Sequence, residues 1–418
     1  MKSDVIVIGA GPAGLIAAGK AAERGLKVTV LERNPRPARK LMITGKGRCN
    51  VTNACTLVNE LMDAIPHNSR FLYGAFSRFM PYDTMDLFEG MGVPLKIERG
   101  NRVFPESDKA VDVVDAIVAY AKNNGARIIT GERVTAILTD ENGITGVTTE
   151  SGNRYDAPDV IVATGGCSYP LTGSTGDGYT LSKCVGHNVT PPTPSLVPLE
   201  TEEYWVRKLQ GLSLKNVSIT IRDTDTYKEV YTDFGEMLFT HFGVSGPMIL
   251  SASAHLRDIR PGKYELSIDL KPALTEEKLD ERVIKDFGKY SNKALGNALQ
   301  ELLPRKLIPV IVSLSGIEPD LRANKITRDM RKDLVWLLKN LTCTIKCTRP
   351  IDEAIITAGG IKTDEIDPKT MQSKKVRGLY FAGEVIDVDA YTGGFNLQIA
   401  FSTGALAGNS VKGDKNND

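Results

Sequence analysis

Residues 4–14 read DVIVIGAGPAG, and this stretch decides the fold. Its β-branched run is typical of a buried strand. Residues 15–24 then have the apolar spacing of a helix, and residues 27–31 form a second strand. The sequence therefore predicts a βαβ unit whose first turn carries the Gly-x-Gly-x-x-Gly pattern, at Gly9, Gly11 and Gly14.

Each glycine of this turn has a physical task if the unit binds a dinucleotide. Gly9 makes the tight turn, Gly11 lets a pyrophosphate approach the backbone, and Gly14 lets the helix pack on the strand. The helix N-terminus presents N–H groups and a positive dipole end to the phosphates. Glu32 ends the second strand, where a carboxylate can bind both ribose hydroxyls. The contacts expected here are Gly9, Ala10, Gly11, Pro12, Ala13, Gly14 and Glu32.

Two further strands end in glycine: DVIVATGG at residues 159–166 and GLYFAG at residues 378–383. Together with the first turn they resemble the FAD domain of glutathione-reductase-like and fumarate-reductase-like flavoproteins. That resemblance implies that Gly383 and Glu384 lie near the ribityl chain or pyrophosphate. It also places Asp177, in the loop STGDG, beside the flavin, although a plain helix-entry loop stays an alternative. The contacts implied near the adenosine end are Ala163, Thr164 and Gly165.

A closer resemblance rests on three motifs spread along the chain. They are RKLMITGKGRCNVTN at residues 39–53, FTHFGVSGP at residues 239–247 and GEVIDVDAYTGGFNLQ at residues 383–398. Together they resemble a bacterial NAD(P)/FAD-dependent oxidoreductase family that includes aminoacetone oxidase and the bile-acid dehydroxylation flavoprotein. The family usually has glycine in place of Lys46 and tyrosine in place of Phe395. It implies FAD as cofactor, with either amine oxidation by O2 or reduction of an enone by a nicotinamide donor.

Residues 45–50 have the chemistry to meet the flavin side of FAD. The loop glycines expose backbone N–H groups, Arg48 is a permanent cation, and Asn50 offers a donor and an acceptor. An arginine on a glycine loop is also often only a solvated surface charge. Cys55 lies outside the spacing of a redox pair with Cys49, so we expect an inert thiol. The contacts expected here and elsewhere are Gly47, Arg48, Cys49, Asn50, Arg33, Lys40 and Val134.

The last helix is predicted over residues 396–407, and its start faces the cofactor. N–H groups there can meet the N1–C2=O side of the isoalloxazine, where negative charge accumulates on reduction. A structural role for Asn396 as the helix cap is compatible with this. The expected contacts are Gly394, Phe395, Asn396 and Leu397.

His241, within FTHFGVSGP, is the candidate catalytic residue. It is either a substrate-facing acid or base or a satisfied structural histidine. The other three histidines have no partner pattern. The sequence contains no HxxxH, HExxH or paired CxxC, so no metal site is expected.

The predicted fold class is α/β: a split, Rossmann-like FAD domain with an inserted β-barrel plus helical domain. The proline-rich TPPTPS at residues 190–195 marks the first boundary. The FAD domain then comprises residues 1–190 and 351–411, and the insertion comprises residues 191–350. Within the insertion we expect a barrel over about 195–270 and helices over about 275–340. Residues 412–418 should form a frayed tail.

Composition excludes several protein classes. Of 418 residues, 41% are hydrophobic and 25% charged, as in a globular chain with a large core rather than a disordered or collagen-like one. The net charge of +1 creates no global field for nucleic acid or an anionic membrane, so neither partner is expected. The absence of a signal or spanning segment and the six scattered cysteines predict a cytoplasmic protein with reduced thiols.

These observations predict an FAD-dependent oxidoreductase that acts on a small organic substrate through hydride transfer at the flavin. No second strand–Gly-x-Gly-x-x-Gly–helix unit exists, so NAD(P)H or O2 is the expected redox partner without a Rossmann site of its own. Three alternatives stay open: a flavin-dependent RNA-modifying enzyme, a nicotinamide dehydrogenase without flavin, and a non-catalytic flavoprotein. The sequence leaves the substrate and the oligomeric state open.

Overall fold

The computed structural model describes residues 1–256 and 258–413, and it divides the chain into two compact units. One unit holds Met1–Ser195 and the chain from Pro350 on, and the other is Leu196–Arg349. Each unit has its own cluster of buried apolar side chains. The predicted α/β class, with a Rossmann-type domain and a barrel, is confirmed.

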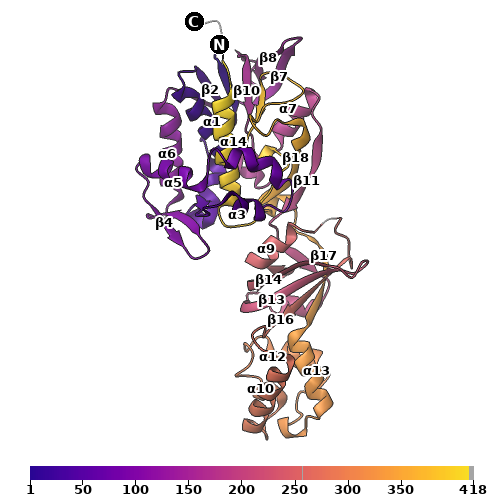
Figure 1. The fold of residues 1–418 in the computed structure, drawn as a ribbon. Coiled ribbons are helices and arrows are strands. Elements are labelled where there is room, and N and C mark those ends of the chain that lie inside the picture. Colours follow the sequence, from indigo (N-terminus) through magenta and orange to yellow (C-terminus); the bar gives the residue numbers. More distant parts are fainter. Residues whose placement is uncertain (257, 414–418) are drawn as a thin grey trace. The chain divides into compact units, whose positions relative to one another are not determined.

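The first unit is built on a five-stranded parallel sheet in the order β19-β10-β1-β2-β6. Figure 1 labels two of these strands, β2 and β10. The strands are β1 (Val5–Ile8), β2 (Val28–Glu32), β6 (Arg127–Thr130), β10 (Asp159–Val162) and β19 (Leu379–Phe381). Four of them, all except β6, are buried along their length, which explains their β-branched and apolar composition. Because all are parallel, their carboxyl ends meet at one edge of the sheet, where ligands bind in such folds.

In this unit α1 (Pro12–Glu23) packs closely against α14 (Phe395–Ser410) and against α6 (Ala110–Asn123). A Cβ at Gly404 of α14 would lie 2.4 Å from the carbonyl oxygen of Ala13, and one at Gly408 would lie 2.3 Å from that of Ala17. Glycine is therefore required on α14 for the two backbones to touch. The last helix is longer than predicted: it begins one residue earlier, at Phe395 after the N-cap Gly394, and ends three residues later, at Ser410.

Smaller elements complete the first unit. The antiparallel sheets are β3-β5-β4 (Thr52–Asn53, Arg102–Pro105, Leu95–Glu98), β7-β8-β9 (Val134–Asp140, Gly143–Thr149, Arg154–Asp156) and β11-β18 (Val189–Ser195, Ile356–Ile361). The remaining helices are α2 (Arg39–Ile43), α3 (Val58–Asp63), α4 (Tyr73–Phe76), α5 (Pro81–Gly90) and α7 (Asp177–Cys184). The backbone N–H groups of Lys412 and Gly413 bond to Asp159 Oδ2 at 2.7 and 2.9 Å, so these two residues are held, and the rest of the predicted tail lies outside the described residues.

The second unit contains a closed barrel in the order β12-β15-β14-β13-β16-β17. Its strands are Leu199–Thr201, Gly243–Ser245, Glu229–Phe239, Ser213–Asp223, Tyr264–Asp269 and Leu341–Thr348, in that order. The barrel is not confined to about 195–270 as predicted, since β17 follows the helices and closes it by pairing with β16 and β12. The helices of this unit are α8 (Tyr204–Lys208), α9 (Pro247–Ser253), α10 (Glu276–Lys289), α11 (Leu295–Ala298), α12 (Ile308–Leu314) and α13 (Arg328–Lys339).

Across the described residues, no helix combines the length and the apolar character needed to cross a bilayer.

Candidate functional site

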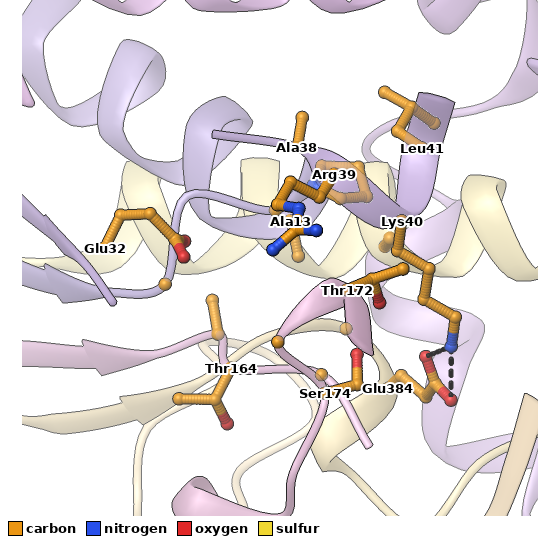
Figure 2. A pocket seen from close by; sticks show the side chains of 18 of the residues that line it. Ala13, Glu32, Ala38, Arg39, Lys40, Leu41, Thr164, Thr172, Ser174 and Glu384 are labelled. Carbon is orange, nitrogen blue, oxygen red and sulfur yellow. Dashed lines mark hydrogen bonds and ion pairs between the residues drawn. The ribbon is translucent and has the colours of Figure 1, made fainter. Parts of the chain in front are cut away.

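A cavity opens at the carboxyl edge of the parallel sheet in the first unit (Figure 2). The cavity has a volume of about 1280 Å³, which includes the space at its mouth that is open to solvent. Its wall is built from the ends of β1, β2, β10 and β19 and the starts of α1 and α14. The predicted contacts that line it are Gly9, Gly11, Pro12, Ala13, Glu32, Arg33, Lys40, Val134, Ala163, Thr164, Gly165, Asp177, Gly383, Glu384, Asn396 and Leu397.

The glycine-rich turn has the geometry that a dinucleotide needs. Gly9 has a φ of +100°, and a Cβ there would lie 2.6 Å from the carbonyl oxygen of Ala163. A Cβ at Gly14 would lie 2.0 Å from the carbonyl oxygen of Gly9, so only glycine lets α1 pack on the turn. At Gly11, by contrast, an added Cβ meets nothing within 4 Å. The space over Gly11 therefore belongs to the cavity, where the N-terminus of α1 can meet a pyrophosphate.

Glu32 is buried at the end of β2 and its carboxylate is turned toward this glycine-rich turn (Figure 2). Its Oε2 accepts the N–H of Ala10 at 2.8 Å, and its Oε1 accepts the backbone N–H and the Nδ2 of Asn34, both at 2.8 Å. A carboxylate accepts about four hydrogen bonds. Glu32 thus stabilises the turn and also lines the cavity. Three of its acceptor positions are occupied by hydrogen bonds within the protein, which leaves about one for a ligand. Ala10 and Gly14 shape the turn without lining the cavity.

Asp177 pairs with Arg33, the residue after Glu32, so it lies at the cavity end expected to hold the adenosine ribose and not beside the flavin as the STGDG resemblance implied. Its carboxylate forms ion pairs with Arg33 and Arg133, and it is the first residue of α7, whose cap is Gly176. Burial by itself raises the pKa of this carboxyl, but the hydrogen bond from Arg133 and the charges of Arg33 and Arg133 outweigh it and hold the pKa below its usual value. Sequence reasoning missed Arg133, because nothing in the local pattern before β7 marks it.

Lys40 and Glu384 form an ion pair inside the cavity (Figure 2). Lys40 Nζ donates to Glu384 Oε2 at 2.8 Å and to Ser168 Oγ at 2.7 Å. Glu384 Oε1 also accepts the backbone N–H of Thr357 at 2.9 Å. The longer glutamate side chain thus reaches across to a lysine 344 positions away, and the two predicted contacts neutralise each other's charge.

Arg39 is a second cation of the cavity wall that sequence reasoning did not assign. Arg39 and Ala13, the second residue of α1, both line the cavity and are labelled in Figure 2. The Arg39 guanidinium donates to Asn34 Oδ1 at 3.2 Å and forms no ion pair with a carboxylate among the described residues. The sequence did contain an indication of its role, since Arg39 is the first residue of the RKLMITGKGRCN motif. The charge and position suit an anionic phosphate.

The loop expected on the flavin side does not line this cavity: Gly47, Arg48, Cys49 and Asn50 all lie outside its wall. Arg48 instead pairs with Glu98 and Asp108 and stacks over Phe104, with its Cζ 4.1 Å from the ring centroid. The carboxylates of Glu98, on β4, and of Asp108 hold the Arg48 guanidinium outside the cavity. Burial raises the pKa of Cys49 to about 12, which makes it an inert thiol. The Oδ1 of Asn50 is buried without a hydrogen-bond partner among the described residues.

At the start of α14 the predicted contacts separate into two groups. Asn396 and Leu397 line the cavity, whereas Gly394 and Phe395 do not. A Cβ at Gly394 would lie 2.3 Å from the carbonyl oxygen of Thr52, so this glycine serves packing. Asn396 binds back to Ala390, accepting its N–H at 2.9 Å and donating to its carbonyl oxygen at 2.7 Å. Its amide therefore shapes the loop before the helix.

His241 lies in the turn between β14 and β15 of the second unit. Its side chain is exposed, with its ring edge-on to Phe242 at a centroid distance of 4.9 Å. It is not a buried structural histidine, and its catalytic role stays a prediction. His187, which sequence reasoning left without a partner, is buried and bonds to Glu365 at 2.9 Å and to Ser373 at 2.8 Å.

Comparison with known proteins adds to this geometry. A family model described as the HI0933-like protein Rossmann domain matches residues 3–410. The chain is 32% identical to the 3-dehydro-bile acid delta(4,6)-reductase of Clostridium scindens, over 97% of this chain and 98% of that protein. It is 30% identical to the ribosomal RNA dihydrouridine synthase of Escherichia coli, over 96% of each chain.

Among solved structures, the chain is similar to the 3-ketosteroid-delta4-(5alpha)-dehydrogenase of Rhodococcus jostii RHA1. The TM-score is 0.50 at 15% identity, covering 98% of this chain and 96% of that one. A quinol fumarate reductase of Escherichia coli also matches, with a TM-score of 0.50 at 16% identity over 98% of this chain and 70% of that one. At these identities the likeness concerns the fold alone.

Proposed function

Since this chain belongs to the HI0933-like family, we propose that it reduces a carbon–carbon double bond conjugated to a carbonyl group in a small organic substrate, with NAD(P)H as electron donor. The chain is an FAD-dependent oxidoreductase, and the proposal concerns which reaction it performs within that class. FAD, when bound, supplies hydride transfer between donor and substrate.

The observation that carries the proposal is a chemical feature shared by two relatives of near-full-length similarity. One is named as a delta(4,6)-reductase of 3-dehydro bile acids, and the other as a dihydrouridine synthase. A double bond at position 4 of a 3-oxo steroid is conjugated to the carbonyl, and so is the uracil double bond that is saturated in dihydrouridine. The substrates differ, but the type of bond is the same.

Different residues of the cavity are suited to bind different parts of FAD. The turn at Gly11 and the cation Arg39 suit the pyrophosphate, and Glu32 suits the adenosine ribose. Lys40 and Glu384 form a polar wall in the cavity, and the start of α14 offers N–H groups beside Asn396. We expect these residues to bind and orient the cofactor and to exclude water from it.

Reduction of such a bond also consumes one proton, and a side chain of the protein is expected to deliver it. His241 is the candidate donor of this proton, because it is an exposed imidazole in the insertion.

A cytoplasmic location is part of the same proposal. It is supported by the cysteines, all six of which are free thiols.

Anaerobic titration of the holoenzyme tests the donor and the acceptor separately. NADH or NADPH should bleach the flavin absorbance near 450 nm on the order of once per active site. Addition of a 3-oxo-Δ4 steroid should then restore the colour and yield the saturated ketone. Bleaching by an amine such as aminoacetone, with hydrogen peroxide formed in air, would instead identify an oxidase. A flavin that no donor reduces would mark a non-catalytic flavoprotein.

A second candidate is reduction of a uridine in RNA, favoured by the match to the ribosomal RNA dihydrouridine synthase. The net charge of +1 speaks against it, because RNA-binding proteins usually carry a positive surplus. Incubation of the donor-reduced enzyme with ribosomal RNA, followed by mass analysis of nucleosides, decides between the two. Dihydrouridine formed at a rate above that of steroid reduction would replace the first candidate by this one.

A further inference from the structure

A glutamine with no exposed surface lies in the first turn of α14, the helix whose start lines the cavity. This residue, Gln398, is the fourth of the helix. Its Oε1 accepts hydrogen bonds from Thr52 Oγ1 at 2.6 Å and from Thr84 Oγ1 at 2.9 Å. Its Nε2 donates to the carbonyl oxygen of Phe79 at 3.1 Å and to Ser402 Oγ at 2.9 Å. A side-chain amide has two donor and two acceptor positions, so all four are used within the protein.

These bonds tie the start of α14 to two other segments of the first unit. Thr52 lies in β3 and Thr84 in α5, while Ser402 stands one turn further along α14. All three residues are fully buried, like Gln398 itself. A buried polar group is tolerated only where it is hydrogen-bonded, and apolar side chains of similar shape would fill the same space without that requirement. The network is therefore informative for its directed bonds, which fix the position of the first turn, and not for its burial alone.

The turn that precedes the helix is held against the same strand. A Cβ at Gly394, the N-cap, would lie 2.3 Å from the carbonyl oxygen of Thr52, so the two backbones are in contact. One residue earlier, the carbonyl oxygen of Gly393 accepts a hydrogen bond from Asn53 Nδ2 at 3.2 Å. The start of α14 is thus held on β3 by Gln398 after the N-cap and by these backbone contacts at the N-cap and before it.

Three backbone N–H groups at this start donate to no other residue in the described part of the chain. The first bond within the helix runs from the N–H of Gln398 to the carbonyl oxygen of Gly394, at 3.0 Å. The N–H groups of Phe395, Asn396 and Leu397 precede that bond, as the first N–H groups of any helix do. Asn396 and Leu397 line the cavity. These donors and the positive end of the helix dipole are suited to stabilise negative charge that forms beside them.

Reduction of the flavin places negative charge on the N1–C2=O side of the isoalloxazine. Donors that are fixed before the charge forms stabilise it without having to reorient. We propose that Gln398 is a positioning residue, which holds the N–H donors of α14 at this side of the ring and thereby raises the midpoint potential of the bound FAD. Gln398 does not line the cavity, so it acts through the helix. The proposal depends on FAD as cofactor and not on the reductase reaction.

The midpoint potential of the holoenzyme tests this without substrate or nicotinamide. It is measured by slow anaerobic reduction with dithionite in the presence of a reference dye. Gln398→Met has nearly the same size but makes none of the four bonds, so the start of α14 loses its tie to β3 and α5. Its affinity for reduced FAD should fall about tenfold relative to its affinity for oxidised FAD, which lowers the midpoint potential by about 30 mV. The FAD content per chain should stay the same, because the turn at Gly11 is unchanged.

Thr52→Val is the milder variant, because it removes one bond to Gln398 and keeps the shape of the side chain. It should shift the midpoint potential in the same direction by a smaller amount. It decides the matter if Gln398→Met does not fold or does not retain FAD.

His187→Gln is the matched control. It also loses buried hydrogen bonds in the first unit, but these join His187 to Glu365 and Ser373 and not to α14. It should lower the melting temperature and leave the midpoint potential unchanged. An unchanged potential in both Gln398→Met and Thr52→Val, or an equal shift in His187→Gln, would overturn the proposal.

Discussion

Gly11 and Gly14 have different roles in the glycine-rich turn: Gly11 leaves space for the pyrophosphate, and Gly14 lets α1 pack on the turn. An added Cβ meets nothing at Gly11, whereas at Gly14 it would lie 2.0 Å from a backbone oxygen. Gly11→Val should therefore leave the apoprotein folded, with a stability change within about 0.5 kcal/mol, but fill the space that the pyrophosphate needs. FAD content after purification and the melting temperature of the apoprotein check both parts.

Gly14→Val is the contrasting variant, and it should lower the melting temperature of the apoprotein because α1 cannot keep its contact with the turn. A yellow Gly11→Val protein with undiminished FAD affinity would show that the pyrophosphate lies elsewhere.

His187 should make stability depend on pH. Burial lowers its pKa below the usual 6.5, against the opposing effect of Glu365, so the folded protein keeps the imidazole neutral. The imidazole of the unfolded chain takes up a proton as the pH falls through 6.5, so the folded state loses stability as the pH falls further.

Burial alone raises the pKa of Glu365, but hydrogen bonds from Lys375 and Asn188 outweigh this effect and lower the pKa to about 2. Its stabilising contribution is therefore lost between about pH 4.5 and pH 2.

The melting temperature should thus fall between pH 7.5 and pH 5.5 in the natural protein. His187→Gln should be less stable at pH 7.5, by about 1–3 kcal/mol for the lost buried hydrogen bonds, but should lose less on acidification. An equal loss in both proteins would assign the pH dependence to other groups.

The turn between β14 and β15 presents His241 on the surface of the insertion. If His241 delivers the proton, His241→Ala should lower kcat/KM by about 10²–10⁴. The flavin spectrum and FAD content should not change, because every residue of the cofactor cavity belongs to the first unit. Steady-state kinetics with absorbance per bound flavin measures both. Lost FAD with unchanged activity per flavin would give His241 a structural role.

The two units have separate apolar cores, so the insertion should be removable. β11 ends at Ser195 and pairs with β18, with Ser195 opposite Ile356, so the chain ends left by deletion of Leu196–Arg349 lie near each other. A short Gly/Ser linker should close this gap. The shortened protein should bind FAD on the order of one per chain but show no turnover. A flavin-free or insoluble product would mean that the cofactor unit needs the insertion to fold.

The FAD cofactor followed from the resemblance of three motifs to a flavoprotein family. The sequence by itself determined the fold class and the position of the glycine-rich turn. These features are local: a strand, a turn and a helix are specified within about thirty residues by apolar spacing and by glycines at required positions. The three glycine-ended strands could be identified for the same reason, and parallel pairing then brings their ends together at one edge of the sheet.

Only the tertiary structure decided which side chains meet. Arg133 reaches Asp177 across 44 positions, Lys40 reaches Glu384 across 344, and His187 reaches Glu365 across 178. Arg48, whose charge suited a cofactor loop, lies instead between Glu98 and Asp108. β17 likewise closes a barrel whose other strands all precede helices α10 to α13. Ion pairs and strand closure depend on distances in space, and no local pattern records which distant partner the folded chain brings within reach.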